Sequence, residues 1–203
     1  MIKYLAPLLL AMALVIFITY DAPPQLEKLS PDSVILALGD SLTYGTGASL
    51  KHSYPSVLQS LGKHNVVNAG IPGETSDKTL LRVKRLLSEH QPALVILCIG
   101  GNDILRRQNL RQTKQNIQQL IDVIRQQGSQ VVLLGVPGFG LFPTAPDFYQ
   151  ALAEENQLPL DDETIPHLLR NPHYKSDQIH PNQLGYRELA QAVFTLLQEH
   201  GAL

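Results

Sequence analysis

The 203-residue chain contains one cysteine and no tryptophan, and it lacks several common cofactor motifs. Cys98 alone cannot form an internal disulfide, and within an apolar run it is interpreted as a small buried hydrophobic residue. No Cys-x-x-Cys, His-Glu-x-x-His or Gly-x-x-x-x-Gly-Lys-Ser/Thr sequence occurs, which excludes the standard zinc and phosphate-loop sites. We therefore expect no metal and no cofactor.

Neither sign of charge is in large excess. The formal net charge is -2, and lysines and arginines form no basic stripe, which argues against a nucleic-acid partner. A length of 203 residues with 44% hydrophobic composition suits one domain with a substantial core. The sequence shows no internal repeat and gives no sign of an obligate protein partner.

Short apolar runs alternate with helical stretches along the chain, and this alternation predicts a parallel sheet covered on both faces. The expected fold class is α/β, a three-layer α/β/α sandwich with a mostly parallel sheet of about five strands. Strands are predicted at Val34–Leu38, Val66–Asn68, Leu94–Ile99, Val131–Gly135 and, weakly, Leu158–Leu160. Helices are predicted at Tyr54–Leu61, Thr75–His90, Leu110–Gln127, Phe148–Asn156 and Pro181–His200, with Pro181 in a first turn.

Four polar motifs follow in order, and the first three stand at the exits of apolar runs. They are Gly39-Asp40-Ser41-Leu42, the segment Asn68–Thr75, Gly100-Gly101-Asn102-Asp103, and Asp177-Gln178-Ile179-His180. In an open α/β sheet the carboxyl ends of the strands form the ligand-binding crevice, so these motifs are expected to meet there.

Together these motifs contain every group that a serine hydrolase needs. Ser41 supplies a hydroxyl nucleophile, His180 a base and Asp177 a carboxylate that orients it. The backbone N–H groups of Ser41 and Gly73 and the amide of Asn102 are candidate oxyanion donors. Gly73 is preferred over the other glycine of its motif because it precedes a predicted helix, whose dipole is positive there.

Each motif alone has an ordinary structural explanation. Gly39–Leu42 is also typical of a capped strand-to-helix turn, the Asn102 motif of a plain turn, and Asp177 with His180 of a surface pair. The ordered combination favours catalysis. No Gly-x-Ser-x-Gly elbow is present, because the residue two after Ser41 is Thr43.

With these motifs the chain resembles the SGNH or GDSL hydrolases, whose four letters stand for Ser, Gly, Asn and His. The match is similar to the small bacterial branch of thioesterase I, arylesterases and lysophospholipases, and it runs from about Val34 to the C-terminus. The resemblance implies a flavodoxin-like fold and a carboxylic ester hydrolase with Ser41 as nucleophile, Asp177 and His180 completing the triad, and Gly73 and Asn102 completing the oxyanion hole. Pro72 departs from the small polar residue that relatives often carry there.

The first 21 residues carry a second signal. Lys3 precedes an uncharged, mostly apolar stretch from Tyr4 to Tyr20, without a clean cleavage site. Residues 1–21 are therefore expected to be a signal-anchor, or a signal peptide that is removed, with residues 22–32 as a linker and 33–203 as the hydrolase domain. This predicts a bacterial cell-envelope location, with the domain in the periplasm and tethered to the inner membrane, or secreted after cleavage.

The apolar loop after the fourth predicted strand bears on the substrate. The loop 136–143 is apolar and is expected at the same sheet edge as Ser41, so Phe139, Leu141 and Phe142 either line an acyl groove or pack the loop onto the domain. Small-molecule or lipid esters are expected: aryl esters, thioesters or lysophospholipids. A carbohydrate O-acetylesterase and an inactive membrane-anchored binding module stay open as alternatives.

Overall fold

Five parallel strands form one sheet in the computed structural model, which describes residues 24–138, 140 and 143–203. Their order is β2-β1-β3-β4-β5, so the chain crosses from one side of β1 to the other after β2. The strands are β1 (Val34–Gly39), β2 (Asn65–Gly70), β3 (Leu94–Cys98), β4 (Gln130–Leu134) and β5 (Leu160–Asp161). The predicted parallel sheet of about five strands is confirmed.

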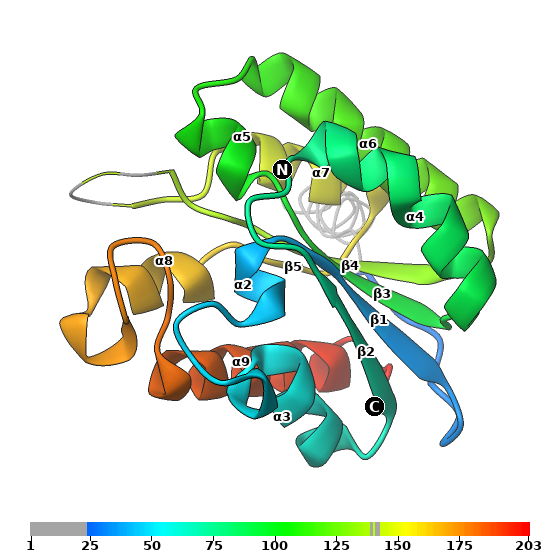
Figure 1. Ribbon diagram of the computed structural model, residues 1–203. Coiled ribbons are helices and arrows are strands. Elements are labelled where there is room, and N and C mark those ends of the chain that lie inside the picture. Colours follow the sequence, from blue (N-terminus) through cyan, green and yellow to red (C-terminus); the bar gives the residue numbers. More distant parts are fainter. Residues whose placement is uncertain (1–23, 139, 141–142) are drawn as a thin grey trace, which may run out of the picture.

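Helices cover both faces of this sheet (Figure 1). One face carries α4 (Ser76–His90), α6 (Leu110–Gln126) and α7 (Phe148–Asn156), and the other carries α3 (Tyr54–Gly62) and α9 (Gln183–Glu199). The three-layer prediction is confirmed. Pro181 does not start α9, because Asn182 is the N-cap and its Oδ1 accepts a hydrogen bond from Gly185 N–H at 3.0 Å.

Short helices that lie outside the predicted helix ranges stand at the carboxyl ends of the strands. They are α2 (Ser41–Tyr44), α5 (Gly101–Leu105) and α8 (Thr164–Arg170), with 3-10 turns η2 (Leu50–His52) and η3 (Pro172–Tyr174). Helices of four to seven residues are too short to establish a hydrophobic period, which is why the pattern missed them.

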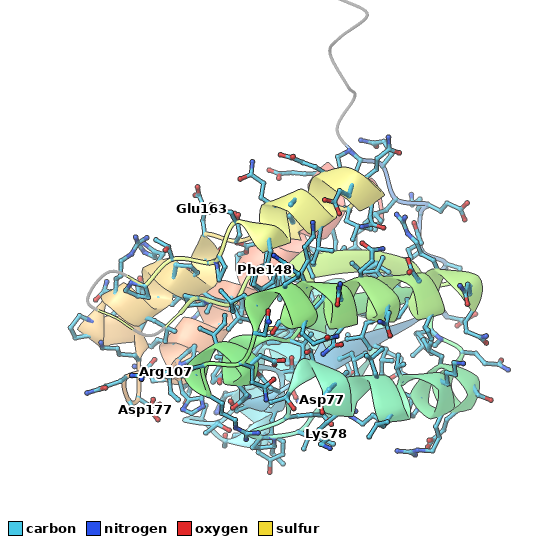
Figure 2. All side chains as sticks on the ribbon, turned by 90° about the horizontal axis from the view of Figure 1, so that it is seen from above. Asp77, Lys78, Arg107, Phe148, Glu163 and Asp177 are labelled. Carbon is cyan, nitrogen blue, oxygen red and sulfur yellow. The ribbon has the colours of Figure 1, made fainter. Side chains whose placement is uncertain are left out.

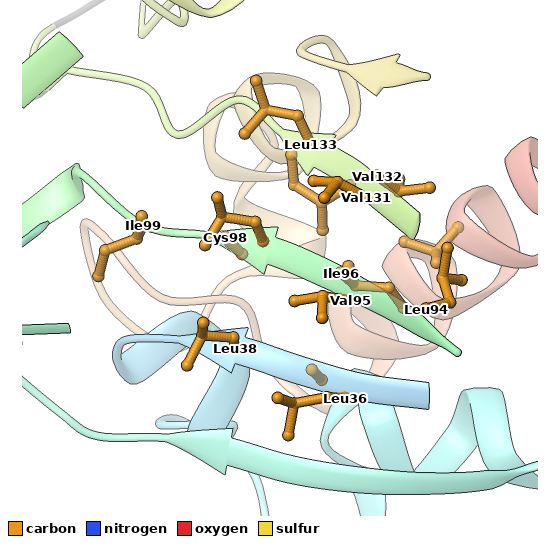
Figure 3. Packing of buried hydrophobic residues seen from close by; sticks show 14 of the residues in the cluster. Leu36, Leu38, Leu94, Val95, Ile96, Cys98, Ile99, Val131, Val132 and Leu133 are labelled. Atoms are coloured by element: carbon orange, nitrogen blue, oxygen red, sulfur yellow. The ribbon is translucent and has the colours of Figure 1, made fainter. Parts of the chain in front are cut away.

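The core is formed by the inner strands and the helix faces that meet them. Side chains of β1, β3 and β4 interlock on both faces of the sheet (Figure 3). Every residue of β3 is buried, including Cys98, which is a free cysteine as the sequence suggested. Buried strands on both faces explain the continuous apolar runs in the sequence.

Residues 24–33 pack against the domain, although the sequence predicts residues 22–32 as a linker. Leu26 N–H donates to the carbonyl of His200 at 2.8 Å, and Leu29 N–H donates to that of Ala202 at 2.9 Å. The Leu29 side chain is buried in the core. The apolar residues of this segment therefore join it to the body of the protein.

The expected N-terminal anchor lies outside the described residues, as do Phe139, Leu141 and Phe142. Among the residues that are described, no helix has the length and apolar character needed to cross a bilayer.

Candidate active site

Ser41 lies at the first position of α2, directly beyond the end of β1. The turn is tight: a Cβ on Gly39 would come within 2.1 Å of the Cys98 carbonyl oxygen, so only glycine fits there. Asp40 caps α2, with its Oδ1 accepting a hydrogen bond from Leu42 N–H at 3.0 Å. The turn and its cap fix the Ser41 backbone at the carboxyl edge of the sheet.

The three predicted triad residues form one hydrogen-bonded chain. His180 Nε2 lies 2.9 Å from Ser41 Oγ, and His180 Nδ1 lies 2.8 Å from Asp177 Oδ2. Both distances are within ordinary hydrogen-bond range, so one imidazole can receive a proton from the hydroxyl while its other nitrogen is held by the carboxylate. The structure thus brings together residues 139 positions apart.

The Asp177 side chain is held in its loop by the backbone of two nearby residues. Its Oδ1 accepts hydrogen bonds from Ile179 N–H at 2.8 Å and from His180 N–H at 2.9 Å. Burial alone would raise the pKa of Asp177, but these bonds and the contact with the His180 side chain outweigh it and hold the pKa below its ordinary value. Asp177 lies at the same end of the molecule as Arg107, which follows α5 (Figure 2).

The three predicted oxyanion donors differ in their present partners. Among the described residues, the backbone N–H groups of Ser41 and Gly73 have no acceptor. The Asn102 amide, in the first turn of α5, donates to Asp40 Oδ2 and to the Glu74 carbonyl, both at 3.0 Å. To bind an oxyanion, the Asn102 amide must therefore give up one of these two hydrogen bonds or share its hydrogen with the oxyanion.

Ser41, Asn102 and His180 line one cavity of about 480 Å³, whereas Gly73 is not among its lining residues. This volume is in the usual range for a small-molecule site. Other walls come from α5, from the segment after β4 and from the region around α8. Gly138, Gly140 and Pro143 line it, so the connection that carries the three predicted apolar residues borders the cavity.

Within the described ranges, no group of three or more His, Cys, Asp or Glu residues is arranged to hold a metal ion.

Comparison with known proteins decides the family. The model of the GDSL-like Lipase/Acylhydrolase family matches residues 37–188. The chain belongs to this family. An arylesterase of Vibrio mimicus is 31% identical over 201 residues, covering 93% of this chain and 98% of that protein. The thioesterase 1/protease 1/lysophospholipase L1 of Escherichia coli K12 is 32% identical over 157 residues, covering 73% and 76% respectively.

A solved structure agrees with this assignment. The crystal structure of TesA aligns with a TM-score of 0.71 at 28% identity, covering 83% of this chain and 99% of that one. The expected family, fold and enzyme class are confirmed, and the GDSL-like protein is a carboxylic ester hydrolase.

Asp40 is part of this GDSL-like site, although sequence reasoning considered it only as a capping residue. Its carboxylate joins the Ser41 turn to Asn102, because one oxygen accepts from Leu42 N–H and the other from the Asn102 amide. Complete burial raises the pKa of Asp40 to about 7. Its place directly before Ser41 was the signal that could have revealed it.

A second missed group supports the loop that contains Gly73. The Arg82 guanidinium pairs with the Glu74 carboxylate, with Nε 2.8 Å from Oε1, and also donates to the Ala69 carbonyl at 2.8 Å. Both side chains are nearly buried, with exposed fractions of 13% and 7%. This pair holds the loop against the end of β2. No sequence motif predicts it, because Glu74 lies in a loop and Arg82 lies eight residues later in a helix.

Proposed function

We propose that the protein is a serine esterase in which Ser41, His180 and Asp177 form the catalytic triad. The observation that carries this proposal is the continuous hydrogen-bonded chain from Ser41 Oγ through His180 to Asp177 at the wall of a cavity. Ser41 Oγ attacks the ester carbonyl carbon while His180 Nε2 takes its proton. His180 then protonates the leaving group, and water hydrolyses the acyl-serine by the same steps.

The negative charge of the tetrahedral intermediate is met by N–H donors. Ser41 and Gly73 have backbone N–H groups without an acceptor among the described residues, and Asn102 lies beside Ser41 in the cavity wall. Asn102 contributes by turning one amide hydrogen from its internal acceptor to the oxyanion. Asp177 keeps the imidazole in the tautomer that leaves Nε2 free for Ser41.

Carboxylic esters with an apolar acyl group fit the cavity best. Its walls include Leu105, Val136, Pro143 and Leu169. The relatives named arylesterase and thioesterase 1/lysophospholipase L1 support aryl esters, thioesters or lysophospholipids as the substrate class. The proposed location is the bacterial cell envelope, because the apolar stretch from Tyr4 to Tyr20 suits export or anchoring and would bring membrane-derived lipids within reach.

Hydrolysis of p-nitrophenyl esters from acetate to palmitate tests the proposal. We expect the full chain to hydrolyse part of this series, and Ser41→Ala to lower the turnover by about ten-thousandfold or more. Ser60→Ala, an exposed serine on α3, is the matched control and should keep full activity. Equal rates for wild type and Ser41→Ala would refute the triad.

A further inference from the structure

Two cations line the active-site cavity, although the chain as a whole has a net charge of -2. Arg170 ends α8, and Lys175 follows η3, five residues later. Asp40 is the single carboxylate among the lining residues, and it is buried with its pKa raised to about 7. The charge presented to a bound molecule is therefore mainly positive.

Neither cation is neutralised in the part of the chain that the structure describes. No carboxylate oxygen lies within 4.0 Å of Arg170 or Lys175, whereas Arg82, Arg85 and Lys114 all have such partners. Lys175 Nζ donates one hydrogen bond, to the Leu169 carbonyl at 3.2 Å, and so keeps two further hydrogens for a ligand.

Carboxylates do lie near Arg170 on its other side. Arg170 also borders a neighbouring hollow, but none of the carboxylates that line it reaches ion-pair distance: Asp161, Asp162, Glu163, Glu188 and Glu199. Asp177, next to the cavity, has its oxygens committed to His180 and to Ile179 N–H. The cavity face of Arg170 is thus free for an anion.

A structural role explains part of this arrangement. Both cations lie near the C-terminus of α8, where positive charge stabilises the last carbonyl groups, as the Lys175 bond to Leu169 illustrates. That role needs no opening toward Ser41. The same cavity is lined by the two cations and by the apolar residues Leu105, Val136 and Leu169, so it offers both cationic and apolar contacts.

We propose that Arg170 and Lys175 form an anion subsite of the active-site cavity, which selects esters carrying a phosphate or carboxylate group near the scissile bond. This rests on the proposed function, since the subsite acts by positioning an ester for Ser41. The anion is bound and not transformed: it pairs with the two cations while the acyl chain lies on the apolar walls.

Two pairs of esters test whether the anion lies on the leaving group or on the acyl chain of the substrate. Decanoyl glycerophosphate and decanoylglycerol, both below their micelle concentrations, differ by a phosphate on the leaving group. The p-nitrophenyl esters of glutaric and pentanoic acid differ by a carboxylate on the acyl chain. The variants are Arg170→Gln, Lys175→Gln and the double variant of the full chain, with Arg187→Gln on α9 as the control for loss of one exposed positive charge.

We expect the KM of one anionic ester to rise about threefold in each single variant and about tenfold in the double variant. The KM of its neutral partner and the kcat of both should stay unchanged, and Arg187→Gln should behave as wild type. A rise confined to the phosphate pair places the anion on the leaving group, and a rise confined to the carboxylate pair places it on the acyl chain.

The same assays separate failure of the subsite from failure of the esterase. Equal KM increases for charged and neutral esters, or no increase for either anionic ester, would overturn the subsite while hydrolysis itself persists. Absence of Ser41-dependent hydrolysis of every ester would instead refute the proposed function. Arg170→Gln is the decisive variant, because its side chain makes no hydrogen bond within the described residues, and its loss should lower the melting temperature only slightly, through the charge removed from the end of α8.

Discussion

The two edges of the sheet are built in different ways. At the carboxyl edge, Asp40, Asn102 and His180 are held by bonds between side chains or from side chains to single backbone groups. At the amino edge, residues 24–29 close onto the last residues of the chain mainly through backbone hydrogen bonds. The first described residues meet the end of the chain there, because Leu26 and Leu29 N–H donate to the carbonyls of His200 and Ala202, just after α9.

The carboxyl edge therefore serves function, and the amino edge serves stability. The carboxyl edge leaves the backbone N–H groups of Ser41 and Gly73 without an acceptor among the described residues, and it keeps a buried carboxyl with a raised pKa. Such groups cost stability and are retained where a ligand will use them. The amino edge has no cavity-lining polar groups of this kind among the described residues, and it buries Leu29 instead.

Replacing Asn102 should damage function far more than folding. Asn102→Ala removes one proposed oxyanion donor, so we expect kcat to fall by about a hundredfold or more. Stability should fall by only about 1 kcal/mol for each lost bond, to Asp40 and to the Glu74 carbonyl. Steady-state kinetics with thermal unfolding measure both effects, and Asn65→Ala, at an exposed site in β2, is the control. An unchanged kcat would remove Asn102 from the catalytic machinery.

Replacing Leu29 should do the opposite at the amino edge. Leu29→Ala empties a buried site in the core, and we expect the free energy of unfolding to fall by about 2–3 kcal/mol with kcat unchanged. Leu81→Ala makes the same chemical change at a side chain that is 79% exposed, and it should alter stability by less than about 0.5 kcal/mol. Denaturant unfolding compares the two. Similar small losses in both variants would mean that residues 24–33 are a linker after all.

Sequence patterns predicted the framework because each long element has its own periodicity. β3 is entirely buried and appears as a continuous apolar run, and α4 and α6 ended within one residue of prediction. The candidate site residues could be proposed together because three of the motifs follow strands, whose carboxyl ends share one edge. Their distance apart in the chain did not matter once the topology was parallel.

What the sequence could not predict depends on contacts made only after folding. The pairing of Arg82 with Glu74 and with the Ala69 carbonyl needs α4, the loop and the end of β2 to be in place. The packing of Leu26 and Leu29 onto the C-terminal residues joins two parts of the chain that are far apart in the sequence, so the pattern of residues 22–32 predicted only a short stiff linker. Arg170 and Lys175 belong to no sequence motif, and only the folded structure shows that they line the same cavity.

The buried Asp40 carboxyl predicts a pH dependence that should be visible even without activity measurements. It keeps its proton in the folded protein up to about pH 7, whereas in the unfolded chain it loses it near about pH 4. Between these values the folded state binds more protons, so the free energy of unfolding falls as the pH rises, by up to about 1.4 kcal/mol per pH unit. Above about pH 7 this loss is complete.

Asp40→Asn should abolish that slope, since an amide does not titrate. The variant replaces one of the two oxygens that accept from Leu42 N–H and Asn102 with an amide NH2 at every pH, so its stability is offset, but it should gain on the wild type steadily from about pH 4 to 7. Asp77→Asn is the matched control: a hydrogen bond from Thr75 lowers the pKa of this exposed carboxyl, so its contribution is present above the unfolded pKa and is lost only as the pH falls lower. Parallel stability curves for wild type and Asp40→Asn over this range would mean that Asp40 is already ionised in the fold, and that a full negative charge holds Asn102 at the carboxyl edge.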